Sequence, residues 1–168
     1  LMAEQRGWAG RLHDVAAREH DAEGKCQDPD DTWQAYNRWP DNYALYDDGQ
    51  NSWYWGNNVA VSFDRPYGKY CQILDAPLTT GSGEWFLWEF PFAFWLESLG
   101  YDVTYISNVD THTDPQGLGR ARGFLSIGHD EYYSIEMFRN LQAAIRAGLN
   151  VAFFSGDTCC GRIEFANN

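Results

Sequence analysis

The stretch GFLSIGHDEYYSIEMFRNLQAAIRAGLNVAFF, residues 123–154, decides the expected fold of this chain. It opens on a short apolar run at 123–127, of the kind that forms a buried parallel strand. Ser134 is a typical N-cap for a helix that ends at Gly148. One face of that helix is apolar and carries Met137, Leu141, Ala144 and Ile145. A second apolar run at 150–154 completes the pattern strand, helix, strand.

The same alternation continues toward the N-terminus. Residues 102–107 (DVTYIS) and 58–63 (NVAVSF) are rich in β-branched residues and predict two further strands. Between them, residues 84–99 have apolar residues at helical spacing and end at Gly100, a typical C-cap. This order predicts the α/β class, with a doubly wound and mostly parallel sheet. Ligands of such sheets bind past the carboxyl ends of the strands.

Two segments before residue 58 differ in composition from the rest. Residues 1–31 are polar and helix-biased, and we expect a loosely packed leader there. Residues 32–57 are rich in Trp, Tyr and Asn and predict an irregular loop that packs through its aromatic rings. We therefore expect one α/β domain over residues 32–168, incomplete at its C-terminal end.

The composition excludes several classes of protein. The 168 residues include 12 Lys+Arg and 24 Asp+Glu, a net charge of −12, which is opposite to the basic surface that nucleic acids require. Four cysteines without a CxxC pair support neither a disulfide scaffold nor a zinc knuckle. No apolar run reaches the ~18 residues of a membrane span, and no signal peptide opens the chain. We expect no nucleic-acid or membrane partner, and a cytoplasmic location is favoured.

The segment GHDEYYS, residues 128–134, is the first candidate site, because it follows a buried strand and precedes a helix. Glu131 could supply oxygen ligands to a hard cation or act as a base. His129 could orient Glu131, bind metal or move a proton. The alternative interpretation is structural. Asp130 and Glu131 would then only stabilise the positive end of the following helix, by ~0.3–1 kcal/mol.

Four weaker candidates have a simple packing interpretation beside the functional one. Asp64–Tyr67 (DRPY) and Thr32–Trp39 (TWQAYNRW) could aim a tyrosine into the crevice or only pack at the sheet edge. Asp110–Asp114 (DTHTD) could bind a divalent metal or form a polar loop. Cys159 and Cys160 follow a strand, so a nucleophilic cysteine is a third functional hypothesis.

Together, these segments resemble a known family. TWQAYNRW, VSFDRPYGKYCQI, GEWFLWEFPFAFWLESLGYDVTYISNVD and GFLSIGHDEYYS followed by NVAFFSGDT closely resemble the large (beta) subunit family of N,N-dimethylformamidase, from about Thr32 to Phe165. The resemblance implies a glutamine-amidotransferase-like or flavodoxin-like α/β domain. It also implies hydrolysis of small N-substituted amides such as formamides.

The resemblance further implies a mononuclear iron held by two tyrosines and one glutamate, with a histidine beside it. By motif, the glutamate falls on Glu131, the histidine on His129, and the tyrosines on Tyr36 and Tyr67, with Tyr70 as the alternative to Tyr67. A trivalent iron deprotonates bound phenols, whose pKa is ordinarily ~10, and three anionic ligands balance its charge. His129 and Glu131 are the expected catalytic residues.

The resemblance leaves some properties open. Asp157 of SGDT stands where relatives are expected to have Asn. Large-subunit relatives are expected to pair with a small subunit, and a homo-oligomer is possible. The alternative to an iron-dependent hydrolase is a non-catalytic α/β module that serves as a scaffold or binding domain of a larger protein.

Overall fold

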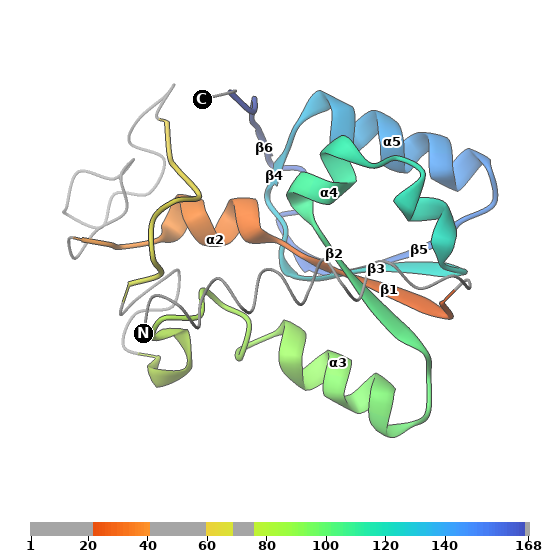
Figure 1. Cartoon of the computed structure of the whole chain (residues 1–168), viewed down its shortest axis with the longest axis horizontal. Coiled ribbons are helices and arrows are strands. Elements are labelled where there is room, and N and C mark those ends of the chain that lie inside the picture. Colours follow the sequence, from red (N-terminus) through yellow and green to blue (C-terminus); the bar gives the residue numbers. More distant parts are fainter. Residues whose placement is uncertain (1–21, 41–59, 69–75, 167–168) are drawn as a thin grey trace.

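The computed structural model of the chain describes residues 22–40, 60–68 and 76–166 and shows an α/β fold (Figure 1). Four strands form one sheet in the order β2-β1-β3-β5, and all neighbours run parallel. They are β1 (Gly24–Asp28), β2 (Val103–Ser107), β3 (Gly123–His129) and β5 (Asn150–Gly156). A short parallel pair joins β4 (Tyr132–Tyr133) to β6 (Gly161–Arg162). The predicted fold class is confirmed.

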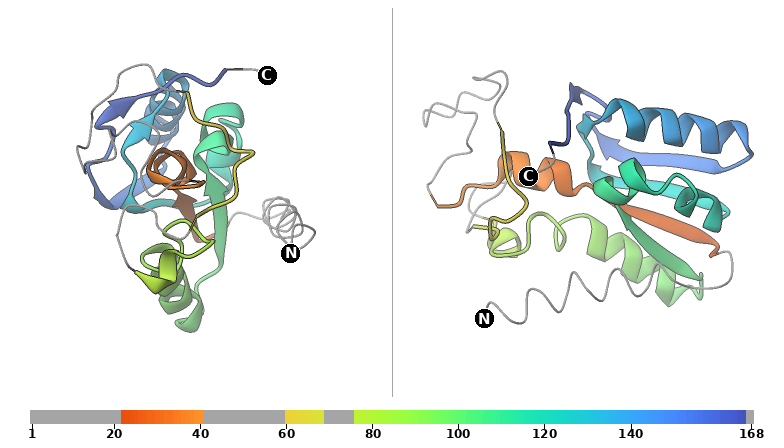
Figure 2. Two further views of the ribbon diagram at one scale, coloured as in Figure 1. Left: turned by 90° about the vertical axis from the view of Figure 1, so that its left-hand side faces the viewer. Right: turned by 45° about the horizontal axis from the view of Figure 1, so that its top comes forward.

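Helices lie on both faces of the sheet. In Figure 1, α4 (Asn108–Thr113) and α5 (Ile135–Arg146) lie above it, and α3 (Glu89–Ser98) lies below it. Helix α2 (Asp30–Tyr36) continues outward from the end of β1, as the right-hand view of Figure 2 also shows. The described residues also include two short 3-10 helices, η1 (Pro77–Thr79) and η2 (Gly117–Arg120).

Each face of the sheet has its own apolar core. Between the sheet and α5 lie Ile106, Leu118, Phe124, Tyr133, Met137 and Leu141. Under the sheet, Cys26, Val103 and Ile127 pack against Phe92 and Leu96 of α3. Burying apolar surface stabilises the fold by ~25 cal/mol per Å², so these two layers hold the strands in place.

The C-terminal half of the chain folds as its sequence predicts. Ser134 caps α5, and its Oγ accepts a hydrogen bond from the backbone N of Met137 at 3.0 Å. Gly148 and Gly100 follow α5 and α3 with φ of 108° and 89°, a conformation that favours glycine. The predicted strands at 102–107, 123–127 and 150–154 correspond to β2, β3 and β5, the last two extended at their carboxyl ends.

The N-terminal half differs from its prediction in two strands. Residues 60–63 form no strand, so the strand predicted at 58–63 is wrong over its described part. Instead β1 lies within residues 1–31, which the sequence predicted to be a helix-biased leader. Its residues, GKCQD, are mostly polar, yet all five are buried between β2 and β3. The polar composition of this segment therefore gave no indication of a strand at the centre of the sheet.

Two helical segments also differ from their predictions. The helix predicted over residues 84–99 begins at Glu89, and turns replace its first part. The polar loop predicted at Asp110–Asp114 belongs largely to α4, which Ser107 caps by accepting a hydrogen bond from the backbone N of Asp110 at 3.0 Å.

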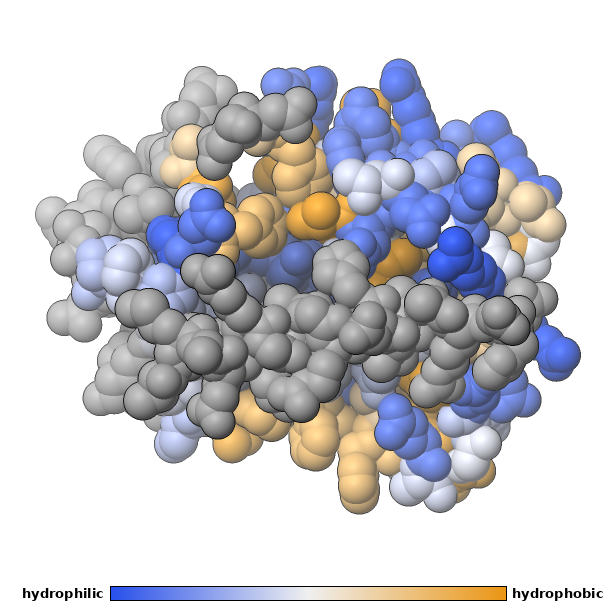
Figure 3. Space-filling view, in the orientation of Figure 1, coloured by the Kyte–Doolittle hydropathy of each residue, from blue (hydrophilic) through white to orange (hydrophobic). Residues whose placement is uncertain are grey.

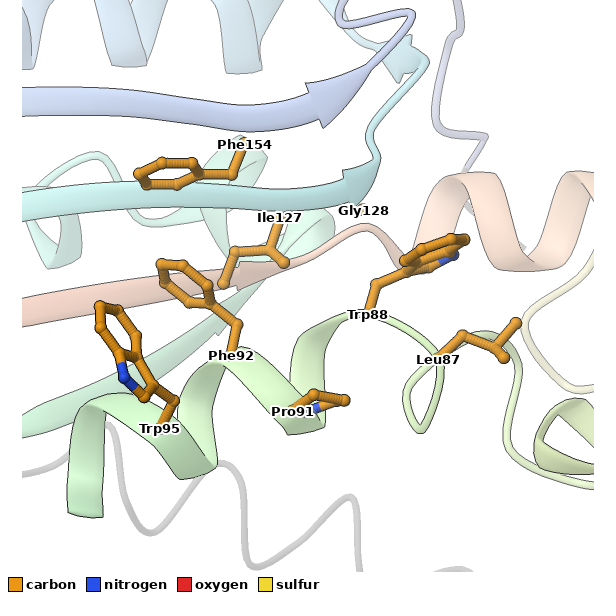
Figure 4. A pocket seen from close by; sticks show the side chains of 8 residues that line it. All are labelled: Leu87, Trp88, Pro91, Phe92, Trp95, Ile127, Gly128 and Phe154. Atoms are coloured by element: carbon orange, nitrogen blue, oxygen red, sulfur yellow. The ribbon is translucent and has the colours of Figure 1, made fainter.

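Apolar side chains remain exposed on the α3 side of the molecule. Figure 3 shows hydrophobic residues gathered along the lower margin, over α3. Phe94 and Trp95 of α3 are 63% and 53% exposed. A groove of about 560 Å³ lies between α3 and the sheet. Figure 4 shows the residues that line it, Leu87, Trp88, Pro91, Phe92, Trp95, Ile127, Gly128 and Phe154. No helix in the described part of the chain is long and apolar enough to cross a bilayer.

Candidate active site

The candidate site lies where the direction of the strand connections reverses. The chain leaves β1 toward β2 on one side of the sheet, and it leaves β3 toward β5 on the other side. The carboxyl ends of β1 and β3 therefore open a crevice between them, which is where ligands of doubly wound sheets bind. Residues 128–134 and α2 both begin at this crevice.

Tyr36 and Glu131, which the family resemblance implies as ligands of one ion, lie in contact in this crevice. The hydroxyl of Tyr36 donates a hydrogen bond to Oε2 of Glu131 at 2.8 Å, and both side chains are buried. A second bond from α2 fixes the backbone, because Oγ1 of Thr32 accepts from the N of Glu131 at 3.0 Å. Helix α2 thus positions the tyrosine and the glutamate relative to one another.

The DRPY turn is anchored to the end of α2. Asn37 bonds to this turn twice, through its Nδ2 to the carbonyl oxygen of Pro66 at 3.0 Å and through its Oδ1 from the N of Gly68 at 3.0 Å. Tyr67 packs edge-on against Trp33, with ring centroids 6.0 Å apart, in the same aromatic cluster as Tyr36. The two tyrosine motifs are therefore neighbours, although ligation by Tyr67 stays a prediction. Tyr70 lies outside the described residues.

His129 lies opposite Gly156 of the neighbouring strand β5. His129 of β3 pairs with Gly156 of β5, and a Cβ on Gly156 would approach Nε2 of His129 to 2.8 Å. The other neighbour of the imidazole is Trp88, whose ring meets it edge-on at 6.4 Å between centroids. Gly156 thus provides the space in which the imidazole lies.

Three side chains converge in a way that could hold a metal ion. One ligand atom each from His129, Glu131 and Asp157 lies within 4.8 Å of the other two. Nitrogen and carboxylate oxygen donors suit divalent and trivalent transition metals. We call these three residues the His129 cluster. The sequence predicted Glu131 as a ligand and His129 as its neighbour, but it noted Asp157 only as a departure from the family pattern.

Asp130, between His129 and Glu131, is fully buried and accepts hydrogen bonds from four side chains. Asn108 Nδ2, Ser126 Oγ and Tyr133 OH donate at 3.0, 2.8 and 2.7 Å, and Gln27 Nε2 also donates. Burial raises the pKa of Asp130, while the donors act in the opposite direction. We call this the Asp130 network. It joins β1, α4, β3 and β4 beneath the site.

Gly128 is required at the start of the site for two reasons. Its φ of 76° favours glycine, and a Cβ at this position would approach Oε1 of Glu89 to 2.5 Å. Burial raises the pKa of Glu89 well above its ordinary value, and the nearby Asp28 adds to the shift. Neither acid was singled out in the sequence, because nothing near them in the chain indicates that they meet.

Two of the four weaker candidates, Asp110–Asp114 and the cysteines, have structural roles or unfavourable chemistry. Asp110 Oδ2 accepts from the N of Ser107 at 3.1 Å, and His112 Nδ1 bonds to Oγ of Ser134 at 2.8 Å. Within the described residues, these two side chains belong to no metal-binding group. Burial raises the pKa of the Cys159 thiol to about 11, which disfavours the thiolate that a nucleophile needs.

Comparison with known proteins agrees with the resemblance read in the sequence. A family model described as N,N-dimethylformamidase beta subunit-like, C-terminal, matches residues 14–168. No curated protein matches the chain. The matched span begins within the segment predicted to be a leader, and it includes β1 and every residue of the candidate site.

Proposed function

The chain belongs to the N,N-dimethylformamidase beta subunit-like, C-terminal family, and from this membership we propose that it is a hydrolase of small N-substituted amides. The proposal includes an iron ion held by Tyr36, Tyr67 and Glu131. The observation that carries it is the contact between Tyr36 and Glu131, 95 residues apart in the chain and joined by a 2.8 Å hydrogen bond.

The residues present fit an iron ion by their donor chemistry. The phenol oxygen of Tyr36 and a carboxylate oxygen of Glu131 lie at hydrogen-bond distance, and both side chains are buried. A ring nitrogen of His129 lies within 4.8 Å of a carboxylate oxygen of Glu131. Two phenolates and a carboxylate would balance the charge of ferric iron. When bound, the ion supplies Lewis acidity for an amide carbonyl and for a water molecule.

The protein's own residues would orient the reactants and move protons. Glu131 is held from both its backbone and its side chain by α2, so its carboxylate has one orientation. His129, beside it, can accept a proton from the attacking water and return it to the departing amine nitrogen. The aromatic cluster of Trp33, Tyr36, Tyr67, Trp85 and Tyr132 would limit access of bulk water and suit a small neutral amide.

Partners of this chain are also proposed from the family. Its description names a beta subunit, which supports a small partner subunit, and a homo-oligomer is compatible with it. The small-molecule partner is an amide of the dimethylformamide class.

Metal analysis and an amidase assay test this function together. We expect purified protein reconstituted with iron to hold one ion per chain, to show a visible tyrosinate-to-iron charge-transfer band, and to release dimethylamine from dimethylformamide. Glu131→Gln should lower iron occupancy, because it removes an anionic ligand. Tyr67→Phe should remove most of the visible absorbance, and Tyr70→Phe should leave it intact.

The non-catalytic alternative predicts a different outcome of the same experiment. A colourless protein that takes up no iron and releases no amine would show that the chain keeps the fold as a scaffold only. Activity that survives thiol alkylation would exclude a cysteine nucleophile.

A further inference from the structure

The apolar groove between α3 and the sheet reaches the candidate active site. Gly128 lines the groove and immediately precedes His129 in β3. Trp88, another lining residue, meets the imidazole of His129 edge-on, with ring centroids 6.4 Å apart. The groove and the histidine expected to move the proton therefore belong to one continuous surface.

Strand β5 shows that the imidazole lies on the same face of the sheet as the groove. Successive side chains of a strand point to opposite faces, so Phe154 and Gly156 face the same side. Phe154 lines the groove, and the centroid of its ring lies 5.0 Å from that of Phe92 of α3. A Cβ on Gly156 would approach Nε2 of His129 to 2.8 Å. The imidazole therefore lies at the end of the groove, beside β5.

The lining of the groove suits an uncharged apolar group. None of its eight lining residues has an ionisable side chain, and most are aromatic or aliphatic (Figure 4). The groove volume of about 560 Å³ lies within the range of ~300–1,000 Å³ that is typical of small-molecule sites. Dimethylformamide carries only methyl groups on its nitrogen and would leave most of this volume unfilled.

We propose that the groove binds the nitrogen substituent of the amide, so that the chain favours formamides with a substituent larger than methyl, such as butyl or benzyl. The inference rests on the proposed function, since it places the amide group at the candidate active site. It adds the class of substituent and two specificity-determining residues, Phe154 and Trp95. Their side chains are 55% and 53% exposed, so a ligand can cover them.

The position of the groove favours a substrate substituent over a protein partner. A polypeptide seated in the groove would cover Trp88 and Gly128, and it would close the approach to His129 from the α3 side. A substituent on the amide nitrogen is instead delivered to the groove by the same molecule that reacts at its end. Each methylene group that it buries strengthens binding by about fourfold.

A series of tertiary formamides tests the inference with the iron-loaded protein. N,N-dimethylformamide, N-butyl-N-methylformamide and N-benzyl-N-methylformamide differ only in one substituent on nitrogen. We expect kcat/KM to rise about tenfold or more from the dimethyl to the benzyl compound, mainly through a lower KM, because the groove binds the substituent in the ground state and the transition state alike. A constant or falling kcat/KM along the series would overturn the inference.

Two variants of β5 assign the effect to the groove. Phe154→Ala removes the β5 wall, and we expect it to raise the KM for N-benzyl-N-methylformamide about tenfold. Phe153→Ala is the matched control, because Phe153 is 48% exposed on the same strand and points to the opposite face of the sheet. It should leave this KM unchanged. If Phe154→Ala does not fold, Trp95→Ala removes part of the α3 wall and should raise the same KM.

Binding to the metal-free protein keeps this inference separate from the proposed function. Isothermal titration with N-benzyl-N-methylformamide should give a dissociation constant about tenfold higher in Phe154→Ala than in Phe153→Ala. If this difference is found but the iron-loaded protein releases no amine, only the proposed function is contradicted. If dimethylformamide is hydrolysed but the two variants bind the benzyl compound equally, only the inference is contradicted.

Light scattering tests the other occupant of the groove, a second copy of the chain. We expect Phe154→Ala and Phe153→Ala to have the same oligomeric state. A smaller assembly in Phe154→Ala alone, with unchanged binding of the benzyl compound, would assign the groove to a protein contact and overturn the inference.

Discussion

The Asp130 network and the His129 cluster are adjacent in sequence and opposite in character. The carboxylate of Asp130 is fully buried and accepts hydrogen bonds from four side chains. Asp157 is exposed, and its carboxylate makes no hydrogen bond within the described part of the chain. The polar atoms of the Asp130 network bond structural elements to one another, whereas those of the His129 cluster remain available for a ligand.

At the carboxyl end of β3, the residues that stabilise the fold are therefore different from those that could bind a ligand. A buried carboxylate is costly unless its donors are present, so Asp130 and its four partners stabilise the fold only as a complete set. The His129 cluster can remain without internal bonds because water reaches Asp157. We therefore expect substitutions in the network to change the free energy of unfolding, and substitutions in the cluster to change ligand binding.

The largest expected effect is that of Asp130→Ala. This change removes the Asp130 acceptor from the donors of Asn108, Ser126 and Tyr133, and it leaves Gln27 Nε2 with only the hydroxyl of Tyr133. We expect it to lower the free energy of unfolding by about 3–5 kcal/mol. Urea denaturation followed by circular dichroism measures it. Asp157→Asn is the matched control, with an expected change within about 0.5 kcal/mol. Equal losses of unfolding free energy in Asp130→Ala and Asp157→Asn would contradict this separation of stabilising residues from ligand-binding residues.

Gly128→Ala should have the next largest effect. The new Cβ would meet Oε1 of Glu89 at 2.5 Å on a backbone with φ of 76°, so we expect a loss of about 2–3 kcal/mol. Gly148→Ala also has positive φ but no atom within 4 Å of the new Cβ. It should cost less, about 1 kcal/mol. If the two variants unfold at the same urea concentration, then contact with Glu89 adds nothing.

The dependence of stability on pH tests the environment of Asp31, whose pKa is affected by the charge of Asp130. Burial, followed by the charges of Asp30 and Asp130, raises the pKa of Asp31 to about 9. The native state then holds a proton that the unfolded state releases near the ordinary pKa of 3.8, so this group's contribution to stability is full below that pH and declines as pH rises toward about 9. Asp31→Asn should flatten this decline and raise stability at pH 8 more than at pH 5, because Asn has no proton to lose. Chemical denaturation at pH 5 and pH 8 compares the two proteins, and parallel pH profiles would contradict the assignment.

Gly156→Ala should change stability least and amidase activity most. Its Cβ would lie 2.8 Å from Nε2 of His129, and the imidazole can turn away from it. We expect a loss of stability below about 1 kcal/mol, together with amidase activity lower by about tenfold or more, because the imidazole that moves the proton is displaced. An assay with dimethylformamide and thermal unfolding on one preparation give both values. A variant with normal activity would show that hydrolysis does not depend on the position of the imidazole.

Sequence patterns were reliable where local chemistry and tertiary packing agree. Ser134, Gly148 and the apolar face of α5 lie where the pattern predicts them, because a cap and a helical spacing are properties of a few neighbouring residues. The segment 128–134 was identifiable as a site for the same reason, since charged residues follow an apolar strand at once.

Local patterns failed where burial overrides composition. Lys25 and Gln27 of β1 have no strong preference for a strand, but β2 and β3 pair with both sides of this segment and bury it. Residues 60–63 have the reverse property. Three of the four residues, Ala60, Val61 and Phe63, are apolar, yet no strand forms over them.

The sequence by itself determined the α/β class, the order of the C-terminal strands and helix, the family, and the choice of Tyr36, His129 and Glu131. These properties depend on residues close together in the chain or on motifs of fixed spacing. Only the tertiary structure decided that β1 lies inside the sheet, that Asp130 closes a network of four donors, and that Asp157 meets His129 and Glu131. The physical reason is that strand pairing and crossover connections bring together residues far apart in the chain, such as Gln27 and Asp130, which are 103 positions apart. No local pattern records which of these residues will share a hydrogen bond or an ion.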